Sequence, residues 1–324
     1  MALHAAVLAL SLAAAPRASI DHIVRYVMGD RHVLGLSLAV VRDGRIVYAR
    51  GYGFADRRRS VRVQPSTVFA IASLEKPFIA ASVLRLCERG RVSLDDPLSK
   101  YVPWYVAARD VTIRELLSNT SGIPDYAQLP GFDRTSRNPV SPEALVRRVA
   151  VLPLRFDPGT QWSYSNTDYV LLGMILQKVT RMPLAAWLHR DLFAPLGLGA
   201  TASWVPILRE RDRAQGSVAP GTPSLAFAAA DLESSALDLG RWIDDLFALR
   251  VVDANDLTQM TDGMGLLAGD IGALRGAWHS GYIEGYSSYL AIVPSKRLGV
   301  VLLCNADTVD LGPLAQSVIE DALR

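Results

Sequence analysis

Strand-like segments lie at both ends of this chain, and helical segments lie between them. Near the N-terminus, residues 34–41 and 45–52 are apolar and rich in β-branched residues, and they flank Asp43-Gly44, a dipeptide typical of hairpin turns. Three more such runs predict an antiparallel meander near the C-terminus: residues 273–280, 286–293 and 298–304. We therefore expect one sheet whose strands come from both ends of the chain.

The segments between these runs have the composition of helices. Helices are predicted over residues 17–30, 73–89, 112–118, 142–149, 167–180, 184–193, 230–249 and 313–323. The pattern predicts an α/β (α+β) fold, with an antiparallel sheet built from both termini, flanking helices and an inserted all-α subdomain. Residues 19–324 are expected to form a single domain, with a sheet lobe at about 19–70 and 225–324 and a helical lobe at about 71–224.

The composition excludes several classes of protein. Half of the 324 residues are hydrophobic and the formal net charge is only +2, which argues against a disordered chain and against nucleic acid as a partner. The five histidines show no metal-binding spacing, so we expect no metal and no cofactor. Cys87 and Cys304 are the only cysteines, and both are predicted to be buried free thiols.

The N-terminus has the pattern of a secretory signal peptide. Residues 5–15 form an apolar run that ends in small residues, and Ala13-Ala14-Ala15 offers a cleavage site. Residues 1–18 are therefore predicted to be a leader, and the protein is predicted to be exported to the periplasm or the medium. No other apolar run reaches the length of about 18–20 residues that a membrane helix needs, so no transmembrane segment is expected beyond the leader.

Ser73 and Lys76 form an S-x-x-K motif at the start of a predicted helix. The three-residue spacing places both side chains on one helical face. A serine hydroxyl needs a base to act as a nucleophile, and lysine can be that base if burial or a second cation lowers its pKa from about 10.4. The structural alternative is a serine at a helix N-terminus and a lysine on the surface.

Two further motifs carry groups suited to the same chemistry. Tyr164-Ser165-Asn166 precedes the helix predicted at 167–180, so the phenol could relay a proton and Asn166 could hold a substrate amide. His279-Ser280-Gly281 ends a predicted strand, whose edge could bind an extended substrate, while Gly281 would allow close approach of a ligand. Taken singly, Tyr164 could be a packing aromatic, Asn166 a helix cap and His279 an ordinary histidine.

The order of these motifs resembles the serine β-lactamase and D-alanyl-D-alanine peptidase family, in its class C and esterase-like branch. The resemblance covers residues 34–320, nearly the whole chain after the leader. It rests on GYGFAD at 51–56, TVFAIASLEK at 67–76, RVSLDDP at 91–97, LLSNTSGIP at 116–124, YSN at 164–166, PLGL at 195–198 and GYSS at 285–288.

The resemblance implies a role for each motif. Ser73 would be the acylated nucleophile, and Lys76, alone or with Tyr164, would accept its proton. Tyr164 would then protonate the leaving group and help to activate water. The backbone N–H groups of Ser73 and Tyr282 would form the oxyanion hole, and Asn166, His279, Ser280 and Gly281 would contribute to substrate binding.

The sequence departs from the family pattern at four positions. Many class C β-lactamases carry Lys-Thr-Gly where this chain has His279-Ser280-Gly281, and a histidine with a pKa of about 6.5 replaces a permanent cation. If His279 binds a carboxylate, substrates with one should bind more tightly below about pH 7. Asn119 stands where the family often has histidine, and Arg181 where it often has glycine, and we expect both differences to be structural. Glu284 lies where the family often has proline, and near the cleft rim it would repel an anionic substrate.

These features together predict a serine hydrolase that acts through an acyl-enzyme on amide, peptide or ester bonds. The closest activities are those of D-alanyl-D-alanine carboxypeptidases and esterases, with weak β-lactamase activity at most. The partner would be a small molecule or a peptide, including cell-wall peptide. The alternative is a penicillin-binding sensor or scaffold that is acylated slowly and does not turn over.

Overall fold

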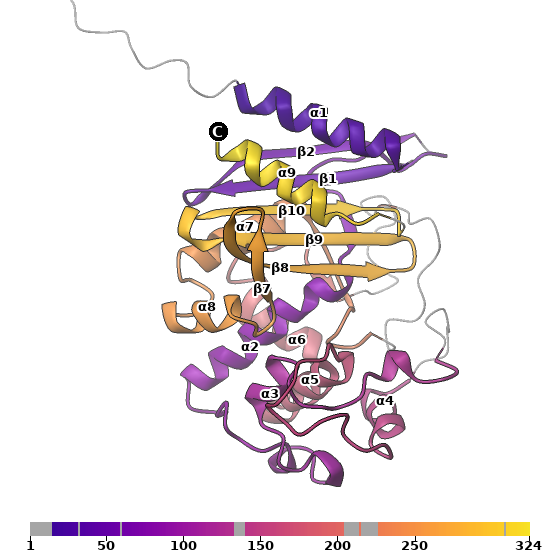
Figure 1. The fold of residues 1–324 in the computed structure, drawn as a ribbon, viewed down its shortest axis with the longest axis vertical. Helices are drawn as coiled ribbons and strands as arrows, with labels where there is room; N and C mark the ends of the chain where they lie inside the picture. Colours follow the sequence, from indigo (N-terminus) through magenta and orange to yellow (C-terminus); the bar gives the residue numbers. More distant parts are fainter. Residues whose placement is uncertain are drawn as a thin grey trace, which may run out of the picture.

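The fold is a mixed α/β arrangement with a large antiparallel sheet above a group of helices (Figure 1). The structure is a computed structural model that describes residues 15–31, 33–58, 60–132, 140–203, 214, 226–307 and 309–324. Most of the predicted leader and the expected lobe boundary near residue 225 lie outside these residues. No helix in the described part is long and apolar enough to cross a membrane.

Within the described residues, seven strands form the main sheet, in the order β3-β2-β1-β10-β9-β8-β7. Their bounds are β1 (Gly35–Arg42), β2 (Arg45–Asp56), β3 (Val61–Arg62), β7 (Leu267–Ile271), β8 (Leu274–Ile283), β9 (Tyr286–Val293) and β10 (Leu298–Cys304). The first strand pairs with the last one, from Leu36 opposite Cys304 to Arg42 opposite Leu298. This pairing confirms the predicted antiparallel sheet from both ends of the chain.

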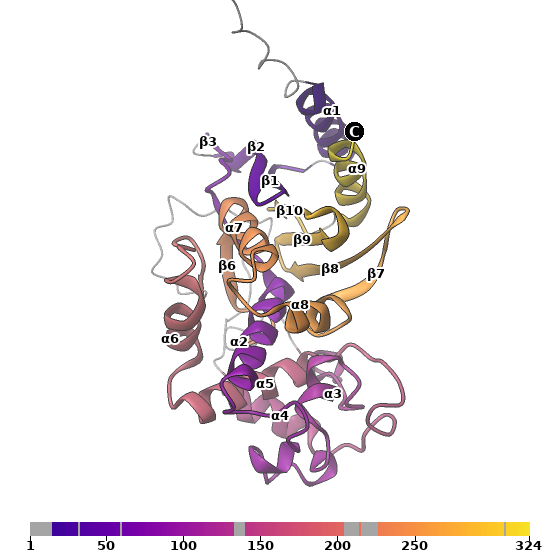
Figure 2. The ribbon, with the colours of Figure 1, turned by 90° about the vertical axis from the view of Figure 1, so that its left-hand side faces the viewer.

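Two terminal helices cover one face of this sheet. The helices α1 (Ala15–Asp30) and α9 (Gly312–Ala322) lie side by side on that face, and α7 (Ala236–Phe247) packs against the opposite one (Figure 2). Two central strands are buried on both faces: β10 is buried along its whole length and β1 along all but its last residue. Their continuous apolar sequences follow from this double burial.

The remaining helices lie mainly below the sheet in Figure 1. They are α2 (Lys76–Glu88), α3 (Ile113–Leu117), α4 (Pro142–Val149), α5 (Asn166–Thr180), α6 (Leu184–Leu188) and α8 (Ala254–Thr261). Arg181 ends α5 in a left-handed conformation, with φ of 57°. This is the conformation that favours glycine at a helix end, which explains the glycine common at this position in the family.

Three details of the sequence prediction are wrong. The helix expected at 230–249 begins only at Ala236, because residues 232–235 form β6 (Leu232–Ser235) and the Ser235 side chain caps α7. This strand joins β4 (Val68–Ala70) and β5 (Ala202–Ser203) in a second, small sheet. The second error is the helix expected at 73–89, which begins as a 3-10 turn. The third is Cys87, which is only half-buried, whereas Cys304 is fully buried as predicted.

Candidate active site

Ser73 and Lys76 lie where a strained turn leads into α2. Strand β4 ends at Ala70, a 3-10 turn spans Ala72–Glu75, and α2 starts at Lys76. Ala72, which precedes the serine directly, has a φ of +48°, a value that residues with a side chain rarely adopt. Such strain is common where a backbone is held for function.

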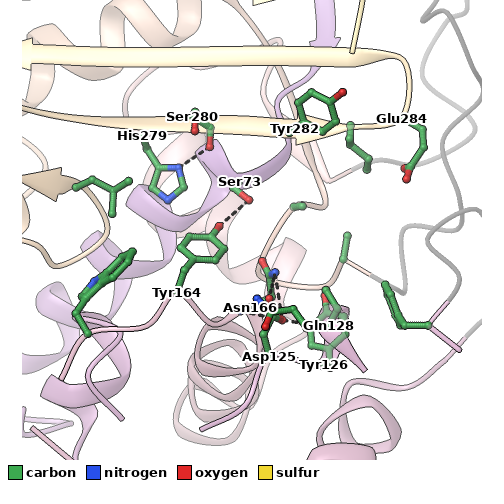
Figure 3. A pocket seen from close by; sticks show the side chains of 17 residues that line it. Ser73, Asp125, Tyr126, Gln128, Tyr164, Asn166, His279, Ser280, Tyr282 and Glu284 are labelled. Atoms are coloured by element: carbon green, nitrogen blue, oxygen red, sulfur yellow. Dashed lines mark hydrogen bonds between the residues drawn. The ribbon is translucent and has the colours of Figure 1, made fainter. Parts of the chain in front are cut away.

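The Ser73 hydroxyl is in contact with two other side chains, of which Figure 3 shows Tyr164. The Lys76 ammonium donates a hydrogen bond to Ser73 Oγ over 3.1 Å, and the Tyr164 hydroxyl donates one over 2.9 Å. Tyr164 comes from the loop before α5, as predicted, and its hydroxyl points toward Ser73. The structure therefore brings together all three residues that the family resemblance names as catalytic.

Lys76 is completely buried, so its ammonium depends on protein acceptors. Besides Ser73 Oγ, it donates to Asn166 Oδ1 at 2.9 Å and to the Ala229 carbonyl at 2.7 Å. The three donors of the ammonium thus have one acceptor each. The structural alternative of a surface lysine is wrong.

Asn166 orients the lysine in this structure. Its side-chain oxygen accepts from Lys76, and its side-chain nitrogen donates to both carboxylate oxygens of Asp125, at 3.0 and 3.3 Å. Both ends of the amide are therefore engaged inside the protein. The predicted contact between Asn166 and a substrate amide stays a prediction, and the observed contacts are those of a positioning residue.

The last five residues of β8 run past Ser73 with one edge open. Strand β7 pairs only with Leu274–Trp278, so His279–Ile283 pairs with β9 alone among the described strands. His279, Ser280 and Tyr282 line the same pocket as Ser73. This edge is available for an extended substrate, while the oxyanion-hole role of the Ser73 and Tyr282 N–H groups stays a prediction.

Gly281 is required for protein packing, while the ligand approach that the sequence suggested stays a prediction. A Cβ atom at this position would lie 2.3 Å from the Ile71 carbonyl oxygen and 2.2 Å from Ser288 Oγ. Ser288 Oγ itself donates to the Ile71 carbonyl at 2.6 Å. The missing side chain thus lets β8 and β9 pack directly against the turn that carries Ser73.

We expect Gly281→Ala to lower kcat/KM for an activated ester by at least about tenfold, because the added methyl group must push β8 away from Ser73. Overpacking of this kind costs about 1–3 kcal/mol, so a lower melting temperature is also expected. Gly29→Ala is the matched control, since nothing lies within 4 Å of its Cβ position. Wild-type kinetics for Gly281→Ala would contradict this account of the packing.

His279 is a neutral histidine in a buried position. Burial, with a smaller contribution from the Lys76 charge, lowers the pKa of His279 to about 3. Its Nδ1 lies 2.7 Å from the Ser280 carbonyl oxygen. This low pKa argues against the expectation that carboxylate binding strengthens below about pH 7, because His279 without a bound carboxylate does not gain its charge in that range.

The pocket above Ser73 has a volume of about 440 Å³. Its wall is mainly aromatic and aliphatic, and polar groups gather at Ser73 and on the floor formed by Asp125 and Asn166 (Figure 3). The sequence prediction missed Asp125, although this residue follows directly on the family stretch at 116–124. It also assigned no role to Glu75, the buried acid inside the S-x-x-K motif.

Glu75 anchors the segment that holds Lys76. Its carboxylate accepts a hydrogen bond from the Asp231 N–H at 2.5 Å, and the Leu232 N–H provides a second one. Ala229, two residues before Asp231, supplies the carbonyl that binds the Lys76 ammonium. Burial raises the pKa of Glu75 to about 7, against the opposing effects of these N–H groups and of Lys76.

We expect Glu75→Gln to lower kcat by about tenfold with KM changed less than about twofold, because an amide turns an N–H donor toward the buried backbone N–H groups. Because the pKa of Glu75 is about 7, the carboxylate becomes protonated as the pH falls below 7, and wild-type activity should decrease there. The Glu75→Gln variant should not show this decrease. Ester kinetics from pH 5 to 9 measure both effects. Glu143→Gln, at an exposed acid on α4, is the control, and an unaltered pH profile in Glu75→Gln would refute the role.

The beta-lactamase family model matches residues 20–323. The chain belongs to this family of serine hydrolases. Protein flp from Staphylococcus aureus (strain COL) is 28% identical, over 89% of this chain and 63% of flp. The putative penicillin-binding protein PbpX from Bacillus subtilis (strain 168) is 29% identical, over 62% of this chain and 51% of PbpX. The chain therefore spans less than two thirds of the length of these curated relatives.

Solved structures of the family have the same fold. D-amino acid amidase from Ochrobactrum anthropi SV3 superposes with a TM-score of 0.86 at 25% identity, over 95% of this chain and 99% of the amidase. The octameric penicillin-binding protein homologue from Pyrococcus abyssi gives 0.85 at 25% identity, over 95% and 77%. Class C beta lactamase from Rhodobacter sphaeroides gives 0.79 at 25% identity, over 94% and 99%. The predicted family and fold class are confirmed.

Proposed function

We propose that this chain is a serine hydrolase that cleaves amide, peptide or ester bonds through a covalent acyl-enzyme on Ser73. The observation that carries the proposal is the position of Ser73 Oγ, in contact with both Lys76 Nζ and the Tyr164 hydroxyl at a 440 Å³ pocket. A nucleophile beside two groups that handle protons, under an open strand edge, has the parts that acyl transfer requires.

In the acylation step, Ser73 Oγ attacks the substrate carbonyl carbon. The serine proton passes to Lys76 in its neutral form or to Tyr164 in its phenolate form, while the carbonyl oxygen takes up the electron pair. The N–H groups of Ser73 and Tyr282 would stabilise this oxyanion by about 3–4 kcal/mol each. As the tetrahedral intermediate collapses, the bond to the leaving nitrogen or oxygen breaks, and the Lys76–Tyr164 pair returns the proton to it.

Deacylation repeats these steps with water as the nucleophile. The Lys76–Tyr164 pair accepts a proton from water, the water oxygen attacks the ester carbon, and Ser73 leaves and regains its proton. Asn166 and Glu75 contribute indirectly. Asn166 binds the Lys76 ammonium, and Glu75 holds the segment whose Ala229 carbonyl also accepts from Lys76.

The similarity to D-amino acid amidase supports amides as one substrate class. Activities of the D-alanyl-D-alanine carboxypeptidase and esterase type are also proposed, with small molecules or peptides, including cell-wall peptide, as substrates. The neutral His279, in place of the lysine of many class C enzymes, argues against efficient cephalosporin hydrolysis. The leader-like composition of residues 5–15 supports export, to the periplasm or the medium.

Intact-mass spectrometry tests the proposal. The protein is incubated with penicillins, p-nitrophenyl esters and D-amino-acid amides, and its mass is followed with time. We expect an adduct of one acyl group on Ser73 that clears with at least one ester or amide. No adduct and no turnover with any of these compounds would refute the proposal.

The same experiment separates the proposal from a second function. The penicillin-binding names of two relatives suggest a sensor or scaffold that is acylated slowly and stays acylated. A stable penicillin adduct without turnover of any ester or amide would favour this alternative. The contacts of Ser73 with both proton-handling groups favour the hydrolase.

A further inference from the structure

The two charged side chains in the described lining of the pocket are both acidic. Among the described lining residues, only Asp125 and Glu284 carry a formal charge at neutral pH. The nearby cation, Lys76, is buried and directs all three donors toward Ser73, Asn166 and Ala229. His279 is neutral in this range, because burial lowers its pKa to about 3. The described part of the pocket therefore has no cation to receive a substrate carboxylate.

Glu284 is the acid that a substrate can reach. It lies at the pocket rim, in the bend between β8 and β9, and is half-buried. Figure 3 shows its carboxylate on the same side of the pocket as Tyr282. Another acid lies close by, since Asp307 accepts a hydrogen bond from the Gly285 N–H. Burial raises the pKa of Tyr282, and the negative charges of Asp307 and Glu284 raise it further. The rim at the end of β8 is thus negatively charged.

Asp125 adds negative charge on the floor of the pocket. It is buried, and its partners are N–H groups of Ala127 and Asn166 that carry no formal charge. A carboxylate held by neutral donors keeps its negative potential in the cavity, and the low dielectric of a pocket strengthens this potential. A bound carboxylate would meet repulsion from both ends of the pocket.

Two exposed aromatic rings line the same pocket as these acids. Trp162 is 56% exposed and Tyr282 is 58% exposed, although both line the pocket. Exposed aromatic side chains at a pocket provide apolar contact area, and their faces attract cations within about 6 Å of the ring centre. The surroundings of Ser73 therefore suit a substrate with an apolar body and a positive end.

We propose that this pocket selects acyl substrates that carry an ammonium group on an apolar or aromatic acyl portion, with Glu284 as the residue that recognises the ammonium, and that it discriminates against substrates that carry a carboxylate. The proposal rests on the serine hydrolase function given above. It names the chemistry of the acyl group, which that function leaves open.

Three p-nitrophenyl esters of para-substituted phenylacetic acid test the selection. They differ only in the para group, which is aminomethyl, methyl or carboxymethyl, so the reacting ester is the same. We expect the wild-type kcat/KM to be at least about tenfold higher for the ammonium ester than for the carboxylate ester, with the neutral ester between them. The ratio should shrink in 1 M salt, where the Debye length is about 3 Å.

Variants assign the selection to Glu284. Glu284→Gln should lower the ratio of the ammonium ester to the neutral ester by about threefold or more, and Glu284→Lys should reverse the preference between the charged esters. Glu320→Gln, an exposed acid on α9, should keep the wild-type ratios. Turnover of the neutral ester with equal rates for both charged esters, or ratios unaffected by Glu284→Gln, would overturn this proposal alone. No turnover of any of the three esters would overturn the hydrolase function, and this inference with it.

Discussion

Ser73→Ala is expected to abolish both the acyl adduct and ester hydrolysis. The hydroxyl is the group in contact with Lys76 and Tyr164, and an alanine side chain has no oxygen to take its place. Removal of a catalytic nucleophile costs up to about 10⁶ in kcat in well-studied serine hydrolases, so we expect a loss of at least about 10⁴. Initial rates with a p-nitrophenyl ester and intact mass after incubation measure the effect.

The control for this variant is Ser317→Ala, on α9 at the far face of the sheet. It should keep wild-type rates and the wild-type adduct. Retention of a mass adduct in Ser73→Ala would assign the nucleophile to another residue, and it would remove the basis of the proposed mechanism. Circular dichroism of both variants shows whether the fold is intact.

Lys76→Ala and Tyr164→Phe are expected to lower kcat/KM by about 10²–10⁴ each, the usual contribution of a positioned acid or base. Both side chains contact the same serine oxygen and handle the same proton. The double variant should therefore lose much less than the product of the two single effects. Ester kinetics of the single and double variants give the coupling directly.

The single and double variants also distinguish the two proton acceptors that the geometry allows. If Lys76 is the base, its loss should reduce the acylation rate more than the loss of the tyrosine hydroxyl does, and the reverse holds if Tyr164 is the base. Lys296→Ala and Tyr26→Phe, at exposed positions, are the matched controls. Near wild-type rates for Tyr164→Phe would exclude the tyrosine from the mechanism, and strictly multiplicative effects would show that the two residues act separately.

Much of the site was predictable because its parts are local in sequence. The spacing of Ser73 and Lys76 spans about one helical turn, so the sequence predicted that the two side chains share one face. The hairpin at Asp43-Gly44 and the closing meander follow from turn residues and strand composition. The family resemblance then named Tyr164, which lies 91 residues from Ser73 and yet donates a hydrogen bond to it.

Other features could not be predicted, because they depend on which backbone packs against which side chain. The turn at Ala229 contacts Lys76 across 153 residues, and the pairing of β6 with β4 brings that turn there. The same packing explains why the helix expected from residue 230 begins later, since four of its residues are taken into a sheet.

The amino-acid sequence by itself determined the family, the sheet built from both ends, and the three catalytic candidates. These depend on local spacing and on motif order, which a linear pattern carries. Only the tertiary structure decided the state of the buried groups: His279 is neutral, Asn166 is occupied by Lys76 and Asp125, and Gly281 leaves room for the Ser73 turn. The physical reason is that burial and distant hydrogen-bond partners set charge and orientation, and both arise only when remote segments pack together.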